Sequence, residues 1–339
     1  MSANTKPNKI ISKRTGVTGD TTLTTFNLYN LFPADHEVQV KINGVLRQAQ
    51  QPPFGQAQNT PLLSTQLAKL SLAIQFELAL PEIIAVQEVG SEAVLQQLAD
   101  RVNLAADTNY RAISPPTSDR RGIQIGFIYD QKRATLLQSF QLSGPEVAAA
   151  FGPTSANPGR EPLVGVFHLA GCELTIINNH FKSNYIPDEL TDQTKKLLRT
   201  NLAQRTAQAQ VVRDYANKLL AENPAALVLV TGDLNTSRRG GTQEDLLRPI
   251  QILAGTGAER PLTNLLPLKK DNYEYTFIWD GEYEILDHML VSPALLDKFV
   301  GVDVLHFNAG YPEALWLNAE TAVRCSDHDP LEARFQFQA

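Results

Sequence analysis

The chain has 339 residues, 43% of them hydrophobic and 19% charged, and it carries a formal net charge of −6. These values are ordinary for a globular protein and argue against a broadly basic nucleic-acid coat, although a local basic cleft with bound divalent cations can still serve an anionic substrate. The two cysteines, Cys172 and Cys325, are too few for a disulfide framework and lack the spacing of a metal site.

The N-terminal segment MSANTKPNKIISKRTG contains basic residues but no apolar core, so no secretory signal is visible. We therefore take the cytoplasm as the default location, with secretion as the alternative if a leader has been removed. No apolar run approaches the ~18 residues that a membrane span needs, so no integral membrane segment is expected. Residues 1–20 are polar and contain glycine, which predicts a flexible N-terminal arm.

The first predicted elements are a strand, a surface excursion and a helix. Residues 21–32, TTLTTFNLYNLF, alternate in polarity and predict a strand. Residues 33–61 are rich in glutamine and proline and predict a long excursion over the surface. After it, leucine and isoleucine recur every three or four residues from Leu63 to Leu78, which is the spacing of an amphipathic helix. EIIAVQEV, at 82–89, predicts a buried strand.

The middle of the chain is rich in strands. Residues 91–103 predict a helix with Ser91 as its N-cap. Three short runs of β-branched and aromatic residues then predict strands: IQIGFIYD (123–130), PLVGVFHLA (162–170) and ELTIINNHF (173–181). A long helix is expected over roughly 193–222, because the Asn-Pro pair that follows ends it.

The last third continues this alternation. ALVLVTGDLNTS, at 226–237, predicts a strand, and 242–255 has a helical pattern that should bend or break near Pro249. Further strands are predicted for YEYTFIWDG (273–281), EILDHMLVS (284–292), VDVLHF (302–307) and ARFQFQ (333–338). About ten strands interleaved with helices favour one domain over residues 21–339 and a four-layer α/β sandwich, two packed mixed β-sheets flanked by helices.

Polar residues stand at the ends of several predicted strands, in FNLYN, IIAVQE, TIINNHF, VLVTGDLN, ILDH and CSDHD. Functional groups collect at such ends because a rigid scaffold can present them to one cleft. Taken alone, the SDHDP segment at the last of these ends is also good turn chemistry, because aspartate bonds its own backbone and proline keeps the preceding residue out of a helix.

These residue types suit the hydrolysis of a phosphate ester. Carboxylates such as Glu88 and Asp327 can hold a hard divalent cation, since Mg²⁺ typically takes one or two carboxylates plus waters. A histidine such as His328 has a pKa suited to taking a proton from water near neutrality. Asn27 and Asn235 are neutral donors for phosphoryl oxygens. No serine or cysteine nucleophile beside a base stands out, which favours direct attack by water.

With these motifs the chain resembles the endonuclease/exonuclease/phosphatase superfamily, which includes pancreatic deoxyribonuclease I, abasic-site nucleases, neutral sphingomyelinases and inositol polyphosphate phosphatases. The resemblance runs from about Thr24 to the C-terminus. The matching pieces, in the family's order, are FNLYN (Asn27), VQE (Glu88), GREPLVGVF (Arg160), NNHFKS (His180), GDLN (Asp233, Asn235), LDHMLVS (Asp287) and SDHDP (Asp327, His328). Each piece is weak evidence, but their common order is specific. It implies a deoxyribonuclease I-like fold.

The resemblance also implies a metal-binding site and a general base. Glu88 would bind the metal, which is Mg²⁺ or Mn²⁺ with Ca²⁺ as a further option, and Asn27 and Asp327 would complete the shell. His328 would be the general base or would contact the phosphate, and Asp287 would orient it.

The remaining positions are implied to hold the substrate. Asp233 and Asn235 would position the attacking water and the scissile phosphate. His180 would lie across the phosphate as the second histidine, as in deoxyribonuclease I. Arg160 stands in a stretch closely similar to that enzyme and would contact phosphate.

Two departures from deoxyribonuclease I bear on these roles. That enzyme supports its second histidine with a glutamate, but the aligned position here is Ile123, with Gln124 beside it, so His180 needs another partner or serves mainly as a phosphate contact. The arginine that follows the metal-binding glutamate there is also absent, because Val89 follows Glu88. This weakens the expectation of the same minor-groove binding.

Within the superfamily, NNHFKS and VTGDLNTS are most similar to the bacterial extracellular-nuclease branch. The sequence therefore predicts a nuclease that acts on DNA rather than RNA by in-line attack of water; a monomer is compatible with it. The first alternative is a sphingomyelinase-like or inositol-phosphate phosphoesterase on the same core, for which the apolar segment NAGYPEALWLN (308–318) would face a lipid. The second alternative is a catalytically silent binding module.

Two residues beside the motifs have open roles. Lys182 follows His180 by two positions and either touches phosphate or is a surface base. His288, next to Asp287, either belongs to the site or packs behind it.

Overall fold

The computed structural model describes residues 21–34, 37–42, 45–50, 63–143, 147, 159–183, 191–236, 243–255, 257, 259–269 and 274–337. The arm predicted for residues 1–20 lies outside them. Among the described residues, twelve strands form two six-stranded sheets and four more form two two-stranded sheets.

The first sheet has the strand order β15-β16-β1-β4-β6-β5. Strand β1 is parallel to β4 and antiparallel to β16, so the sheet is mixed. Its strands are β1 (Thr21–Leu31), β4 (Ile83–Val89), β5 (Tyr110–Ile113), β6 (Gln124–Asp130), β15 (Phe299–Val304) and β16 (Leu331–Phe335).

The second sheet has the order β11-β14-β10-β9-β8-β7. Strand β10 is parallel to β9 and antiparallel to β14, so this sheet is mixed as well. Its strands are β7 (Ala134–Gln141), β8 (Leu163–Leu169), β9 (Cys172–His180), β10 (Leu227–Asp233), β11 (Thr263–Asn264) and β14 (Asp287–Val291).

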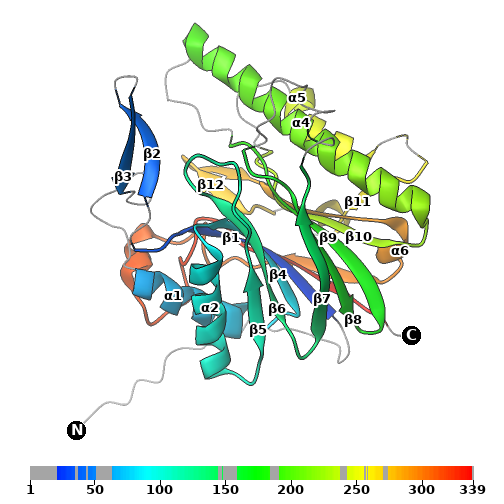
Figure 1. The fold of residues 1–339 in the computed structure, drawn as a ribbon, viewed down its shortest axis with the longest axis horizontal. Helices are drawn as coiled ribbons and strands as arrows, with labels where there is room; N and C mark the ends of the chain where they lie inside the picture. The colour runs from blue at the N-terminus through cyan, green and yellow to red at the C-terminus, as the bar shows by residue number, and fades with distance from the viewer. Residues whose placement is uncertain are drawn as a thin grey trace.

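Helices cover the outer faces of both sheets (Figure 1). Helix α1 (Leu63–Leu72), its π-helical extension (Ala73–Glu77) and α2 (Glu92–Ala105) pack on the first sheet, and α4 (Asp192–Glu222) and α5 (Gln243–Ala254) pack on the second. A third apolar cluster, which includes Phe127 and Phe167, fills the space between the sheets. The predicted four-layer α/β sandwich is therefore confirmed.

Two small hairpins form two-stranded sheets of their own. The predicted excursion over 33–61 contains β2 (Glu37–Ile42) paired with β3 (Val45–Gln50), which the glutamine- and proline-rich composition concealed. Residues 51–62 lie outside the described residues. The second hairpin pairs β12 (Phe277–Trp279) with β13 (Glu282–Glu284). The described residues also contain short helical turns at Leu266–Leu268, α6 (Pro293–Leu296) and Glu313–Leu317.

Two details of the predicted helices can be compared with the structure, the N-cap at Ser91 and the helix around Pro249. Ser91 caps α2 as expected, because its side chain accepts a hydrogen bond of 3.2 Å from the backbone N–H of Val94. Of the bend or break predicted near Pro249, the break does not occur, since α5 runs through that residue. Leu253 of α5 is fully buried in the cluster between α5, α4 and the sheet, and this packing offsets the hydrogen bond that proline cannot donate. Among the described residues, no helix is both long and apolar enough to cross a membrane.

Candidate active site

Strand register brings the predicted polar residues to one edge of the two sheets. In the second sheet Asp233 of β10 pairs with His180 of β9 on one side and with Asp287 of β14 on the other. In the first sheet Asn27 of β1 pairs with Gln87, the residue before Glu88. Because paired residues in a sheet point to the same face, the two rows meet where the sheets face each other.

His328 and Asp287 form a close pair at this edge. Nδ1 of His328 lies 2.7 Å from Oδ2 of Asp287, and both side chains are buried. Burial lowers the pKa of His328, but the carboxylates around it, chiefly that of Asp287, hold that pKa well above the ordinary value. The hydroxyl of Ser326 accepts a hydrogen bond from the His328 backbone and donates one to the carbonyl of Asn27. The pair is thus fixed to both sheets.

The Asp233 carboxylate lies at the centre of the site, close to Asn27, both histidines and the backbone of Asn235. Its Oδ2 accepts a hydrogen bond of 3.1 Å from Nδ2 of Asn27 and lies 3.5 Å from Nε2 of His180 and 3.9 Å from Nε2 of His328. Its Oδ1 accepts a bond of 2.9 Å from the backbone N–H of Asn235. Burial is the largest reason why the pKa of Asp233 is raised, to about 7.

Asn235 and Glu88 both hold backbone conformations that favour glycine. Asn235 has φ of 49°, which asparagine tolerates, and its side chain donates a hydrogen bond of 3.2 Å to the carbonyl of Phe181. Glu88 has φ of 61° at an irregularity where β4 pairs with β6. Its Oε2 accepts a bond of 2.9 Å from the backbone of Asn30, another residue with positive φ. Such strained positions cluster at functional sites, where the surrounding structure compensates for them.

The carboxylates at this edge fit a divalent cation. Oδ1 of Asp327 is buried and has no hydrogen-bond partner among the described residues. Burial raises the pKa of Asp327 to about 6, and the nearby carboxylate of Glu88 adds to this rise. Crowded carboxylates that resist ionisation, one with an oxygen lacking a partner, are the donor set that a hard cation stabilises. Glu88 and Asp327 therefore fit such an ion, and Asn27, whose amide oxygen accepts a hydrogen bond of 3.0 Å from the backbone of Tyr29, stays a predicted third ligand.

A second set of candidate ligand atoms comes from Glu88, His180 and Asp233, which all lie within 4.8 Å of one another. Nε2 of His180 is 3.9 Å from Oε1 of Glu88. A metal-bound histidine usually donates its other ring N–H to an acceptor, but Nδ1 of His180 is buried without a partner in the part of the chain that the structure describes. This favours His180 as a hydrogen-bond donor through Nε2 over His180 as a ligand.

Arg160 lies behind the site. Its guanidinium is buried, donates to the carbonyls of His180 and Phe181, and forms an ion pair of 3.3 Å with Asp119. These bonds hold the end of β9 in place. The predicted contact of Arg160 with phosphate stays a prediction, and its hydrogen bonds show a supporting role.

His288 packs behind the site rather than in it. The imidazole is buried; its Nε2 lies 2.8 Å from the hydroxyl of Thr236 and its Nδ1 lies 3.3 Å from Nδ2 of Asn264. Burial lowers the pKa of His288 to about 4, so it is neutral at physiological pH. Its neighbour Asp287 points to the opposite face of the strand, toward His328.

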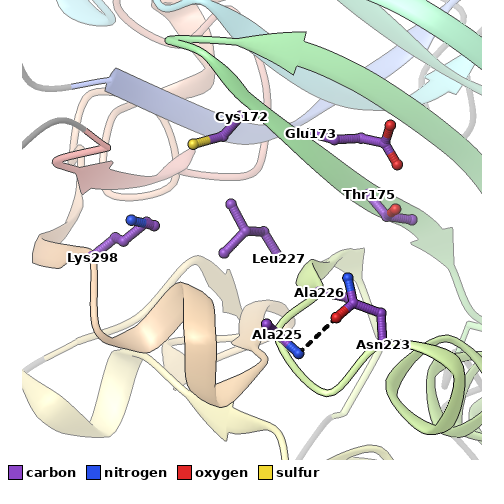
Figure 2. Close-up of a pocket in the computed structure, with 8 residues that line it drawn as sticks. All are labelled: Cys172, Glu173, Thr175, Asn223, Ala225, Ala226, Leu227 and Lys298. Carbon is purple, nitrogen blue, oxygen red and sulfur yellow. Dashed lines mark hydrogen bonds between the residues drawn. The ribbon is translucent and has the colours of Figure 1, made fainter.

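A pocket lies at the far end of the same strands (Figure 2). It is lined by the start of β9, including Cys172 and Glu173, and by residues 223–227 that lead into β10. Because β9 runs from Cys172 to His180, the pocket and the polar edge lie at opposite ends of the strand. The pocket therefore does not belong to the candidate site.

Sequence reasoning missed the groups that support the site. Gln87 and Asn178 are fully buried amides that bond to each other across the two sheets, and Phe277 packs its ring 4.9 Å from the ring of His328. A polar residue inside an apolar strand run was the available signal for the two amides. The contact of Phe277 depends on how the hairpin folds back, which no local pattern encodes.

Comparison with known proteins agrees with this geometry. A model described as the endonuclease/exonuclease/phosphatase family matches residues 22–316. No curated protein matches the chain.

Solved structures share the fold at low sequence identity. An endonuclease/exonuclease/phosphatase from Bacteroides vulgatus is 17% identical with a TM-score of 0.57, covering 94% of this chain and 99% of its own. TDP2 of D. rerio, complexed with a single-strand DNA product, is 15% identical with a TM-score of 0.56, covering 93% and 98%. A mannosyl-6-phosphatase of Bacteroides thetaiotaomicron is 17% identical with a TM-score of 0.55, covering 92% and 98%.

Proposed function

The chain belongs to the endonuclease/exonuclease/phosphatase family, whose members are phosphoric ester hydrolases, and from this premise we propose that it is a divalent-metal-dependent nuclease that hydrolyses DNA phosphodiester bonds. The observation that carries the hydrolytic part is the convergence of His328, Asp287, Asp233 and His180 on one strand edge. Two imidazoles face a single carboxylate there, beside a group of oxygen donors suited to a cation.

Glu88, Asp327 and Asn27 would hold the cation, for which Mg²⁺ and Mn²⁺ are the first candidates and Ca²⁺ the next. A divalent cation bound there supplies charge neutralisation for the phosphoryl oxygens. The protein's part is to fix the donors, and the Asn30 backbone does this for Glu88 through the bond to Oε2.

The proton transfer falls to His328. Its Nδ1–H donates to Asp287, so Nε2 is the atom that faces Asp233 and can take a proton from water. Asp233 and Asn235 would orient that water and the phosphate. Nε2–H of His180, on the other side of Asp233, would donate to a phosphoryl oxygen.

Aromatic side chains beside His328 favour a substrate with nucleobases. Phe277 contacts the His328 ring, and Trp279 lies parallel to Phe277 with ring centroids 6.3 Å apart. Trp279 is 41% exposed and Tyr283, on the partner strand of the hairpin, is 60% exposed. Exposed rings next to a phosphate site can stack bases of a single strand, and each stacked base contributes about 1–3 kcal/mol to binding. The D. rerio structure with its single-strand DNA product supports the same substrate class.

The lipid alternative loses its sequence argument. The segment 308–318 was expected to present apolar side chains, but Trp316 in it is buried and packs 4.4 Å from the ring of Tyr29. Leu317 is the one large hydrophobic residue of this fully described segment that is exposed, and the acidic Glu313 is exposed beside it. An acidic segment with a single exposed leucine is a poor lipid-binding surface.

Cleavage of covalently closed plasmid tests the proposal. We expect nicking with added Mg²⁺ or Mn²⁺, none with EDTA, and loss of activity in His328→Ala. Linear DNA as a second substrate detects an exonuclease that leaves closed circles intact. If folded, metal-supplied protein spares both DNAs, the nuclease proposal fails, and inositol phosphates and sphingomyelin become the substrates to test.

A further inference from the structure

Lys182 presents a positive charge next to the candidate site that the proposed reaction does not use. Its side chain is half-buried, and its ammonium has no acceptor among the described residues. Its backbone is fixed from both sides by α4, because its N–H donates 2.8 Å to Oε1 of Gln208 and its carbonyl accepts 3.1 Å from Nη1 of Arg205. The lysine is thus held in place.

Arginine side chains lie around Lys182 in the part of the chain that the structure describes. Arg160 bonds to the carbonyls of the two residues before Lys182, and Arg205 to that of Lys182 itself. Arg160 and Arg121 share one carboxylate, that of Asp119, at 3.3 Å each. Burial, Arg160 and Arg121 all lower the pKa of Lys182, so these groups lie within electrostatic reach of it.

This group of basic side chains stands next to the candidate site of a chain with a net charge of −6. The ammonium of Lys182 is only half-buried, so an anionic group of the substrate could reach it there. Lys182 follows His180 by two residues, and its charge and that of Arg121 act on the pKa of His180. Lys182 and Arg121 therefore lie beside the position proposed for the scissile phosphate, and Lys182 stands two residues beyond the end of β9.

We infer that Lys182 and Arg121 form a second anion subsite, which binds the phosphate next to the scissile one in a polynucleotide chain. This inference rests on the proposed function and narrows it, because a substrate with a single isolated phosphate would leave the subsite empty. Lys182 is then a determinant of specificity for chains over single phosphodiesters.

Three substrates separate the subsite from the reaction centre. Bis(p-nitrophenyl) phosphate has one phosphodiester and no neighbour, and an oligothymidylate has a charged neighbour at every linkage. An oligothymidylate with alternating methylphosphonates keeps cleavable phosphodiesters but makes every neighbour neutral. Lys182→Met is compared with Lys132→Met, a matched loss of charge on an exposed lysine after β6, away from the site.

On oligothymidylate we expect Lys182→Met to lower kcat/KM by about 10- to 100-fold, the range for a lost charge-assisted hydrogen bond. Its loss on the alternating substrate and on bis(p-nitrophenyl) phosphate should be several-fold smaller. Lys132→Met should match the wild type on all three. Equal losses for Lys182→Met on the charged and alternating substrates would overturn the subsite. The loss of the lysine and the loss of charge on the neighbouring phosphates would then act independently.

Binding without turnover keeps the two proposals separate. Fluorescence anisotropy of the labelled oligothymidylates, in EDTA, should show that Lys182→Met weakens binding of the charged chain but not of the alternating one. If the wild type hydrolyses none of the three substrates, the nuclease proposal fails while this binding comparison still decides the subsite. If Lys182→Met weakened binding of the charged and the alternating oligothymidylate equally, the proposed subsite would be refuted.

Discussion

The side-chain amide of Gln87 donates a hydrogen bond of 2.8 Å to Oδ1 of Asn178, and this bond joins β4 of the first sheet to β9 of the second. Both residues are fully buried. Nδ2 of Asn178 also donates to the carbonyls of Val86 and Gly126, at 3.0 and 2.8 Å. Gln87 precedes Glu88, and Asn178 stands two residues before His180, so the amide bridge sets how far apart the two halves of the site lie.

Replacing Asn178 by leucine should therefore affect stability and activity together. The variant removes one acceptor of the Gln87 amide and the side-chain donor to two carbonyls, and we expect a loss of about 1–3 kcal/mol in the free energy of unfolding. Urea unfolding measures this, and kcat on a DNA substrate should fall in conditions where the variant is fully folded. Asn179→Leu is the matched control, since that amide bonds within the second sheet alone. Equal activity losses in both variants would contradict a positioning role for the bridge.

The pair of His328 and Asp287 predicts the pH dependence of the reaction. The carboxylates around it raise the pKa of His328, so the imidazole is able to accept a proton only as pH rises through that value. Asp287→Asn removes one negative charge, which lowers this pKa. The acid limb of the kcat/KM profile should then move to lower pH, while kcat at the optimum falls by about 10²- to 10⁴-fold. A variant with reduced kcat and an unmoved acid limb would show that His328 is not the titrating base.

Metal binding should stabilise the protein in a defined pH window. The folded-state pKa values of Asp233 and Asp327 are raised from 3.8 to about 7 and about 6. A raised carboxyl pKa means that the metal-free fold is more stable when these groups are protonated and loses stability as pH rises from about 4 to 7. A divalent cation binds the ionised form, so the rise in Tm on adding Mg²⁺ or Mn²⁺ should be small at pH 5 and large at pH 8.

Glu88→Gln tests where that cation binds. The variant should lose most of the metal-dependent rise in Tm at pH 8, because one of the two carboxylates proposed to face the ion is gone. Glu173→Gln, an exposed glutamate at the opposite end of β9, should keep it. Thermal unfolding with and without the cation measures both. A full metal response in Glu88→Gln would place the cation elsewhere.

The sequence predicted the features that have a local signal. The alternation and turn residues revealed most strands of the two sheets, and the polar strand ends pointed to the side chains that the fold brings together. Short or weakly apolar strands such as β7 and β13 gave no comparable pattern. Supporting groups such as Gln87 were missed because the partners that give them their role are distant in the sequence, 91 residues away for the bond from Gln87 to Asn178. The bonds of Arg160 to the carbonyls of His180 and Phe181 were not predicted, because nothing local reveals which carbonyls a guanidinium will meet.

Lys69 gives the last prediction, since its ammonium fixes the segment that leads into the site. The side chain is fully buried, and the three N–H groups of Nζ are shared among four backbone carbonyl oxygens at 2.8–3.0 Å, those of Leu315, Asn318, Thr321 and Val323. This segment runs directly into Cys325, Ser326 and the proposed ligand Asp327. Lys69→Ala leaves the four carbonyls facing a cavity, and we expect it to cost at least about 3 kcal/mol of unfolding free energy.

The cavity of Lys69→Ala also allows chemical rescue, which separates a bound cation from a general effect of salt. Propylammonium supplies the missing carbons and the N–H donors, so it should raise the Tm of the variant in a saturable manner and restore part of its kcat. Tetramethylammonium has the same charge but no N–H, and it cannot donate to the carbonyls. Since the wild type keeps its own ammonium, it should respond to neither beyond an ordinary salt effect. An equal response of the variant to both cations would refute the carbonyl cage as the reason for the loss.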